Sequence, residues 1–404
     1  VTDVLDNVPS VAVDVEGNIS LRGNENVRIL INGKPSALSG ISPETLRQLP
    51  ADAIEKVEVI TNPSARYDAE GSAGLINIIL KQNKITGFNG TVNVFTGFPE
   101  NHGVAATLNL RTEKLNIFTN TTYRYEDSPG NALNDQENFD ENGNTTGFQK
   151  EVRDRSRQQS GFTTNLGFEF LIDSTSSITN SFVFRKSEGE NPTDTNYFNS
   201  DAAGNPTIQR NRFTLEDEAN EDAQYSLNYI KRFNNDGHEL TVDYQYSSGK
   251  DFEDSVIEEV VLNGGIQLDT EETINNEKQK NQLVQFDYVR PFGKENKGQF
   301  ELGYRGTFNV FDNNFAFGIQ DENGQITPDP DFTNNLVYKE YVNAAYTQLG
   351  NKFGKFNLLG GIRMEASRIG INLLTTQDFN LKKYTDWFPS VFVGYEFSEK
   401  EQLT

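Results

Sequence analysis

The segment IEKVEVITNPSARYDAEGSAGLINIILK, from Ile54 to Lys81, decides how the rest of the chain is interpreted. Apolar and β-branched residues concentrate near its two ends, and they predict strands from Val57 to Thr61 and from Gly74 to Lys81. Between these strands, Asn62–Pro63 and Gly71 supply turn-forming residues. A strand–turn–strand unit occurs in many folds, so its meaning depends on the segments that precede it.

Those preceding segments predict a small α+β unit. Alternating residues flank a Gly-Asn turn between Val11 and Arg22, which indicates a β-hairpin, and a further strand is expected from Val27 to Ile31. Ser42 is a suitable helix N-cap and Pro43 suits the first helical position, so a short helix should follow. A unit of this size buries little apolar surface, and we expect it to pack against a larger partner.

Taken in order, LRG at Leu21–Gly23, LINGKP at Leu30–Pro35 and the hairpin resemble the plug domain of TonB-dependent outer-membrane receptors. That family has an IE-x-[IV]-EV strand, a Pro-Ser/Ala-x-x-Tyr turn and a G-x-INI-x-x-K strand, which correspond here to Ile54–Val59, Pro63–Tyr67 and Gly74–Lys81.

Two positions depart from the family pattern, because many relatives carry Gly where this chain has Asn62 and Asp68. The segment NPSARYDAEG is similar to the corresponding sequence in the Bacteroidetes branch, so the resemblance implies the Bacteroidetes-type outer membrane β-barrel family.

Composition excludes several classes of protein. The chain has 59 Asp and Glu against 36 Lys and Arg, a formal net charge of -23, which disfavours nucleic-acid partners because phosphates require a basic surface. It has no Cys, and its two histidines, His102 and His238, lie far apart in the sequence. We therefore expect no catalytic residues, no metal site and no cofactor, and we do not expect an enzyme.

The mean hydropathy is -0.62, and no apolar run approaches the roughly 18 residues that a transmembrane helix requires. A transmembrane β-barrel can still have such a composition, because only alternate residues of each strand are apolar. The chain begins at VTDVLDNVPS, already inside the plug-like pattern and without a signal peptide, so we expect a mature or trimmed sequence.

After Lys84 the sequence changes to a period of two. Apolar residues alternate with polar residues in at least five segments, whose apolar members are Phe162, Leu166, Phe168 and Phe170; Tyr225, Leu227 and Tyr229; Leu240, Val242, Tyr244 and Tyr246; Val284, Phe286 and Tyr288; and Phe300, Leu302 and Tyr304. Each segment should be a strand with one apolar and one polar face. Such strands suit both a soluble β-sandwich and a membrane barrel, so alternation alone leaves the choice open.

The connections favour the barrel. Short turns are expected at Thr112–Lys114, Asp173–Ser176, Asn234–Gly237, Gly293–Gly298 and near Gly354, and they alternate with long polar stretches at about Glu126–Ser160, Ser187–Asn220, Ser247–Lys278 and Gly318–Asn335. Outer-membrane barrels alternate short periplasmic turns with long extracellular loops, whereas structureless loops of that length are uncommon in compact soluble domains.

The expected fold is therefore a plug domain over residues 1–84, followed over residues 85–404 by antiparallel transmembrane strands from the N-terminal portion of a β-barrel. About a dozen strands are visible in the sequence, of the 22 that the family's barrels contain. An open barrel edge would leave backbone groups unsatisfied in lipid, so we expect a fragment of a longer protein. The expected location is the outer membrane of a Gram-negative bacterium, in contact with its lipid.

The resemblance also indicates which residues meet a solute. Upper plug loops contact the ligand in this family, which makes Asn24, Glu25, Lys34 and Ser36 the ligand-contact candidates. Ordinary turn chemistry explains the same residues equally simply.

Arg22 is a candidate plug–barrel lock, paired with a carboxylate in the barrel lumen; the candidate partners are Glu169, Asp243, Asp287 and Glu301. The alternative is a solvated arginine, because an exposed ion pair contributes only about 0 to 1 kcal/mol.

Two further patterns have a simpler interpretation. Asn138, Asp140 and Asn142 follow the first half of a calcium-loop spacing, but Gln149 stands where the bidentate Glu is needed, and DENG recurs at Asp321–Gly324. Both stretches are predicted to be hairpin tips. The 15 Tyr and 29 Phe suit aromatic girdles at the membrane interfaces, with sugar-stacking loops as the alternative.

The resemblance implies active uptake of a scarce solute, such as a metal chelate, a cofactor or an oligosaccharide, driven by the periplasmic TonB complex through a segment absent from this sequence. A surface lipoprotein is a further expected partner. The alternatives are an outer-membrane barrel that binds or adheres without transport, and a secreted soluble protein in which a plug-like domain precedes a β-sandwich.

Overall fold

The computed structural model describes residues 5, 8, 11–13, 19–21, 27–31, 34–35, 54–60, 74–80, 86–233, 237–321, 323–398 and 401–403. Within these residues the structure is almost entirely antiparallel β-sheet, with one short 3₁₀ helix, η2, at Lys294–Asn296. None of the helices found in the described part of the chain is long and apolar enough to span a membrane.

The N-terminal strands form two small sheets. Their bounds are β1 Val11–Val13, β2 Ile19–Leu21, β3 Val27–Ile31, β4 Lys34–Pro35, β5 Ile54–Ile60 and β6 Gly74–Leu80. The first two strands pair as the expected hairpin, and the other four form a sheet in the order β4-β3-β6-β5.

The deciding segment folds as predicted. Strands β5 and β6 pair antiparallel, and β6 also pairs parallel with β3, which places it centrally in the sheet. Leu75, Ile76 and Ile78 of this strand are fully buried. The helix expected after Ser42 lies outside the described residues.

The rest of the chain forms one large sheet. Its strands are β7 Gly87–Gly97, β8 Asn101–Arg111, β9 Leu115–Asp127, β10 Gly130–Phe139, β11 Thr145–Arg155, β12 Gln158–Asp173, β13 Ser176–Asp201, β14 Pro206–Arg232, β15 Glu239–Val261, β16 Ile266–Gln267, β17 Glu271–Phe292, β18 Gly298–Gln320, β19 Ile326–Pro328, β20 Asn334–Phe353, β21 Phe356–Leu373, β22 Asp378–Ser398 and β23 Glu401–Leu403.

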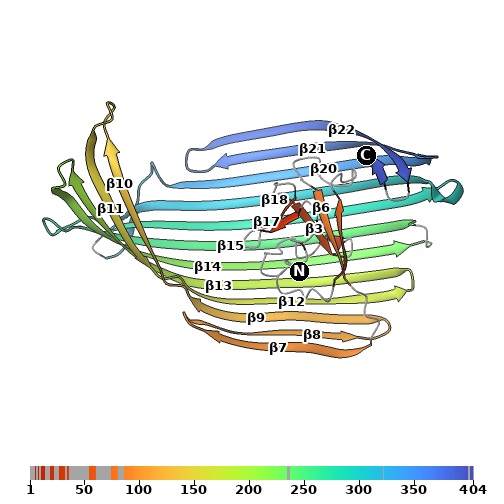
Figure 1. The fold of residues 1–404 in the computed structure, drawn as a ribbon, viewed down its shortest axis with the longest axis horizontal. Coiled ribbons are helices and arrows are strands. Elements are labelled where there is room, and N and C mark those ends of the chain that lie inside the picture. The colour runs from red at the N-terminus through yellow and green to blue at the C-terminus, as the bar shows by residue number, and fades with distance from the viewer. Residues whose placement is uncertain are drawn as a thin grey trace.

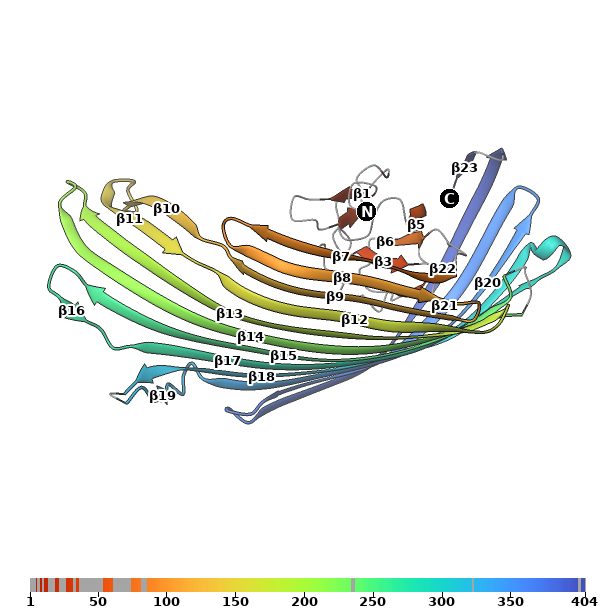
Figure 2. The same ribbon diagram turned by 90° about the horizontal axis from the view of Figure 1, so that it is seen from below.

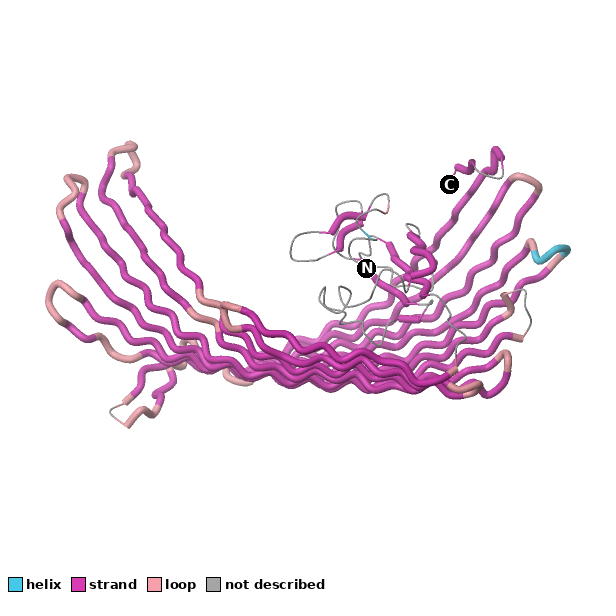
Figure 3. Tube along the Cα trace, turned by 60° about the horizontal axis from the view of Figure 1, so that its bottom comes forward, coloured by secondary structure: helices cyan, strands magenta, loops and turns pink. Residues whose placement is uncertain are grey.

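Twelve of these strands form a continuous antiparallel meander, namely β7, β8, β9, β12, β13, β14, β15, β17, β18, β20, β21 and β22. This agrees with the dozen strands expected. The sheet curves into a trough, and β3, β5 and β6 lie on its concave side (Figures 1 and 2). The trough shape is clear along the Cα trace (Figure 3).

Both short and long connections are present, but the prediction that the long ones are structureless loops is wrong. The hairpin β10–β11 lies within 126–160, and β13 extends through 26 residues to Asp201, whereas a tilted membrane strand needs about 9–11. Backbone pairing between β13 and β14 continues to Ser200 opposite Pro206, which keeps these polar segments extended. These connections are thus tall hairpins that project from one end of the sheet, and the predicted short turns lie at the opposite end. Two further short turns, β7–β8 and β21–β22, lie at the end with the tall hairpins.

Three hairpin tips share the pattern Asp-x-x-Gly-[Asn/Gln], at Asp140, Asp201 and Asp321. In each tip the aspartate Oδ1 accepts hydrogen bonds from the backbone N–H groups two and four residues later. The glycine takes a positive φ, 82° at Gly204, which a residue with a Cβ rarely adopts. Side-chain and backbone donation from Asn205 holds the pKa of Asp201 below its usual range.

The two faces of the large sheet have opposite chemistry. Its convex face exposes large apolar side chains, including Leu166 at 53% and Leu302 at 44%, while polar side chains such as Asp287 and Arg363, each 2% exposed, are buried on the concave face. A soluble sandwich would bury the apolar face instead. This inversion is the pattern of a barrel wall with lipid outside and a polar lumen inside.

Aromatic side chains border the apolar band. At the end with short turns, Phe233 stacks on His238 with ring centroids 4.4 Å apart, and Phe356 meets Tyr395 at 4.8 Å. Tyr225 and Tyr244, whose ring centroids lie 6.3 Å apart on neighbouring strands, stand within the band. The pairs at the short-turn end fit a girdle at that membrane interface, and a second girdle stays a prediction.

Candidate functional site

A connected polar network lies on the concave face, on strands β17, β18 and β20. Asp287 accepts a hydrogen bond from the Tyr346 hydroxyl and another, of 2.7 Å, from Gln285 Nε2. Arg305 Nη1 in turn donates to Gln285 Oε1 at 2.7 Å. Three neighbouring strands are therefore connected by side chains that are all at most 9% exposed.

Further buried polar contacts lie on the strands to either side of this network. On β14 and β15, Asn228 donates to Asp243 at 2.6 Å, and on β21 Arg363 Nε donates to Glu365 at 2.6 Å. Buried polar groups cost free energy unless they are hydrogen-bonded, so these contacts hold the wall in one arrangement. The described lumen wall is therefore polar, and side-chain hydrogen bonds hold it on β14, β15, β17, β18, β20 and β21.

Three of the four candidate lock carboxylates are buried on this face: Asp243 at 7%, Asp287 at 2% and Glu301 at 9% exposed. The fourth, Glu169, lies on the same face of β12 and is partly buried. Their common partner in the prediction, Arg22, lies outside the described residues, so the pairing stays a prediction.

The ligand-contact candidates also fall mostly outside the described part. Asn24, Glu25 and Ser36 are not described, and Lys34 is described only as a backbone position of β4, paired with Ile31. The structure therefore does not bring these four residues together or separate them.

Above the network the concave face is hollowed by a cavity of about 370 Å³, which sequence reasoning missed. Five strands, β13, β14, β15, β17 and β18, form its floor. Most of its polar lining is uncharged, in the form of Gln224, Gln245, Ser247, Gln279 and Asn281, and its charged residues are Arg185, Asp222 and Arg305.

Beyond the hollow, toward the hairpin tips, the concave wall is acidic. Glu218 lies directly opposite Glu253, and Asp251 lies directly opposite Glu277. A hydrogen bond with Glu216 and burial raise the pKa of Glu218, and burial with the nearby Asp222 and Glu277 raises the pKa of Asp251. No grouping of three or more metal-ligating side chains is found within the described residues.

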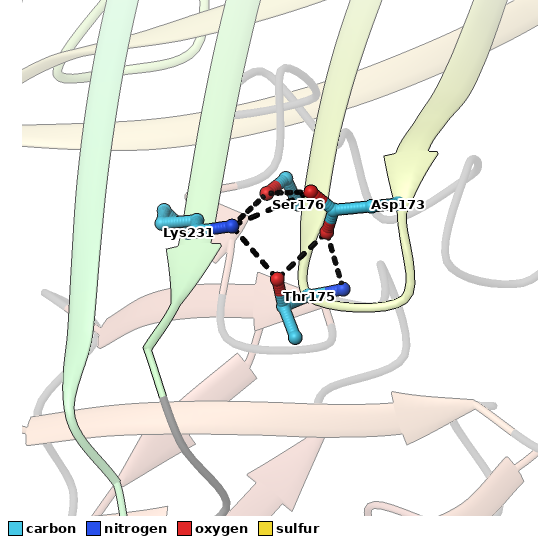
Figure 4. A network of polar contacts seen from close by, with 4 residues as sticks. All are labelled: Asp173, Thr175, Ser176 and Lys231. Carbon is cyan, nitrogen blue, oxygen red and sulfur yellow. Dashed lines mark hydrogen bonds and ion pairs between the residues drawn. The ribbon is translucent and has the colours of Figure 1, made fainter.

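At the opposite end, a compact polar network ties the β12–β13 turn to β14 (Figure 4). Lys231 Nζ donates to Ser176 Oγ at 2.7 Å and to Thr175 Oγ1 at 2.8 Å, and it lies 3.4 Å from Asp173 Oδ2. Asp173 Oδ1 accepts from the Thr175 hydroxyl and from its backbone N–H. The pKa of Asp173 is therefore held well below its usual range, with Thr175 as the largest cause.

This network predicts a pH effect on stability. Because the folded-state pKa of Asp173 is lowered, its ionised form stabilises the turn above the ordinary value of about 4, and this contribution is lost as pH falls toward the folded pKa. The wild-type chain should exceed Asp173→Asn in thermal unfolding midpoint at pH 7, and the difference should shrink below pH 4. A difference that stays constant down to pH 3 would contradict the assignment.

Two family models match the chain. The TonB-dependent Receptor Plug Domain matches residues 1–75, and the Outer membrane protein beta-barrel family matches residues 231–404. Among curated relatives, the ferric enterobactin receptor of Pseudomonas aeruginosa is 32% identical over 106 residues, or 24% of this chain. The probable TonB-dependent siderophore receptor PirA of Acinetobacter baumannii is 36% identical over 100 residues, or 22% of this chain. These matches span 14% and 12% of those two receptors.

Solved structures agree on the fold. The ferric citrate transporter FecA in its unliganded form matches with a TM-score of 0.50 and 13% identity, over 99% of this chain and 58% of that chain. The copper transporter OprC also matches with a TM-score of 0.50, at 14% identity, over 98% of this chain and 58% of that chain.

A plug followed by a barrel wall with a polar lumen and an apolar outer face defines an outer-membrane protein. The chain belongs to the TonB-dependent receptors, a family of transporters and receptors and not of enzymes. Its more specific assignment to the Bacteroidetes branch stays a prediction.

Proposed function

We propose that the protein is a receptor for TonB-dependent uptake of a scarce solute across the outer membrane. The observation that carries the proposal is the wall itself, which is apolar outside, buried and polar inside, and preceded by the plug-domain sequence. The relatives named above are described as receptors or transporters for ferric chelates and copper, which supports uptake without naming this chain's substrate.

In this proposal residues 1–84 form the plug and residues 85–404 form part of the wall, with further strands completing the barrel. Arg22 holds the resting plug by pairing with one of the lumen carboxylates, of which Asp287 is the most buried described candidate. Asn24, Glu25, Lys34 and Ser36 face the solute. Periplasmic TonB pulls on the plug, and a surface lipoprotein is a further proposed partner.

The test is uptake in an outer-membrane host that expresses the full reading frame, with and without TonB. Radiolabelled metal chelates, cofactors and oligosaccharides are supplied at limiting concentration, and at least one should enter at least tenfold faster when TonB is present. A barrel that inserts and binds a solute, yet transports none of the panel, would instead support the non-transporting binding barrel.

A further inference from the structure

The hollow in the lumen wall has the chemistry of a site for hydroxyl groups. Its amide and hydroxyl side chains can each donate and accept hydrogen bonds, as the contact of Asn281 Nδ2 with Ser247 Oγ at 3.4 Å illustrates. Its volume of about 370 Å³ lies in the range of small-molecule sites, about 300–1,000 Å³. Uncharged groups that can both donate and accept hydrogen bonds are better partners for sugar hydroxyls than for a charged chelate.

A glycine helps to keep this hollow open. Gly249 lines it on β15, and a Cβ placed there would come within 2.7 Å of Asp222 Oδ1 on the facing strand. Any larger residue would move the Asp222 side chain and occupy part of the space. The absence of a side chain at this position therefore gives the hollow its present shape.

Aromatic residues on β18 and β20 extend the surface of the hollow across the neighbouring strands. The strand register places Phe311 of β18 directly opposite Gln279, and Tyr338 of β20 directly opposite Phe311, all on the concave face. Directly opposed side chains on one face are close enough to act together. Aromatic faces beside amide groups provide an apolar platform next to hydrogen-bonding partners.

The electrostatic surroundings disfavour an anion. Two arginines line the hollow. Arg185 faces Asp222 across the strand pair, and Arg305, which is 9% exposed, donates to Gln285, so its positive charge lies within the network that contains the Asp287 carboxylate. The wall beyond them carries carboxylates held by amides: Glu277 accepts from Asn313 at 2.9 Å and Glu216 accepts from Asn191 at 2.9 Å. Amide donors leave the negative charge in place, and like charges repel an approaching anion.

We propose that this hollow binds a neutral, hydroxyl-rich solute, a short oligosaccharide, and that the acidic wall above it rejects anionic ferric chelates. The inference rests on the proposed function, because it names the substrate class of the same lumen. It differs from the ferric enterobactin and the siderophore named for the two curated relatives, whose sequence match is confined to about a quarter of this chain.

The test measures binding to the purified full-length protein in detergent, where TonB plays no part. The probes are neutral oligosaccharides of glucose, mannose, xylose and galactose, with ferric enterobactin and ferric citrate as anionic chelates. At least one oligosaccharide should bind and neither chelate should. The double variant Gln279→Ala with Asn281→Ala should weaken binding at least tenfold, and Gly249→Val should weaken it independently by filling the hollow.

Lys278→Ala with Lys280→Ala is the matched control, because these side chains lie on the opposite face of the same strand and binding should not change. Heat-modifiable migration on gels verifies that each variant is folded. Binding of a ferric chelate, binding unaffected by the hollow variants, or no binding of any oligosaccharide would overturn the inference. An oligosaccharide that binds through the hollow but is not taken up would overturn only the proposed transport.

Discussion

Replacement of Leu166 by arginine is expected to lower the free energy of unfolding by about 2–4 kcal/mol, the cost of a cation on the lipid face near the bilayer midplane. Leu166 is 53% exposed on the convex face, midway along the alternating apolar positions of β12 from Phe162 to Phe170. If the convex face met water, this cost would be absent, because a substitution at an exposed surface position usually stays within about 0.5 kcal/mol. The measurement is a urea titration of the full-length protein in lipid bilayers.

The matched control for that variant is Thr107→Arg. The register places Leu166 opposite Thr119, and Thr119 opposite Leu108, so Thr107 lies at nearly the same depth. Its side chain is exposed on the concave face, and the change should stay within about 0.5 kcal/mol, as for an ordinary surface substitution. Equal effects at the two positions would mean that the faces have been assigned incorrectly.

The second large effect is expected in the lumen network. Asp287→Ala removes the acceptor of the Tyr346 hydroxyl and of the Gln285 amide, and both donors remain buried. A hydrogen bond to a charged group contributes about 1.5–3 kcal/mol, so we expect a loss of roughly 3–5 kcal/mol in the free energy of unfolding.

Two variants separate this explanation from simple loss of volume at Asp287. Asp287→Asn keeps an acceptor oxygen and should cost clearly less than Asp287→Ala, while Tyr346→Phe removes a single donor to the carboxylate and should cost about 1.5–3 kcal/mol. The same urea titration measures the free energy of unfolding of all three variants. A loss for Asp287→Ala no larger than that for Tyr346→Phe would show that the network contributes little.

The sequence predicts the sheet well where its two faces differ. Leu240, Val242 and Tyr244 alternate with polar residues because lipid faces one side and the lumen the other, and the predicted strands agree with β15. Near Glu190 and Asp217 both faces are polar, so the period of two disappears although the strands continue. This is why tall hairpins are predicted as loops.

The candidate site was harder to predict for a different reason. Asp243 and Asp287 could be assigned to the lumen from strand periodicity alone, since each is a polar position within an alternating run. The hollow depends on how five strands are aligned, which sets Gly249 beside Asp222 and Gln279 beside Phe311. Such register is fixed by hairpin turns far from the site, and no local motif records it.

The most direct measurement is the labelling of single cysteines in intact cells, because residues 1–404 contain no cysteine that would be labelled in their place. Glu141→Cys places a thiol in the β10–β11 hairpin tip, and Glu113→Cys places one in the short β8–β9 turn, both at exposed positions. A membrane-impermeant maleimide should label the first in intact cells and the second only after the outer membrane is permeabilised. Equal labelling of both in intact cells, or the reverse order, would contradict a barrel wall that spans the outer membrane with its acidic hairpins outside.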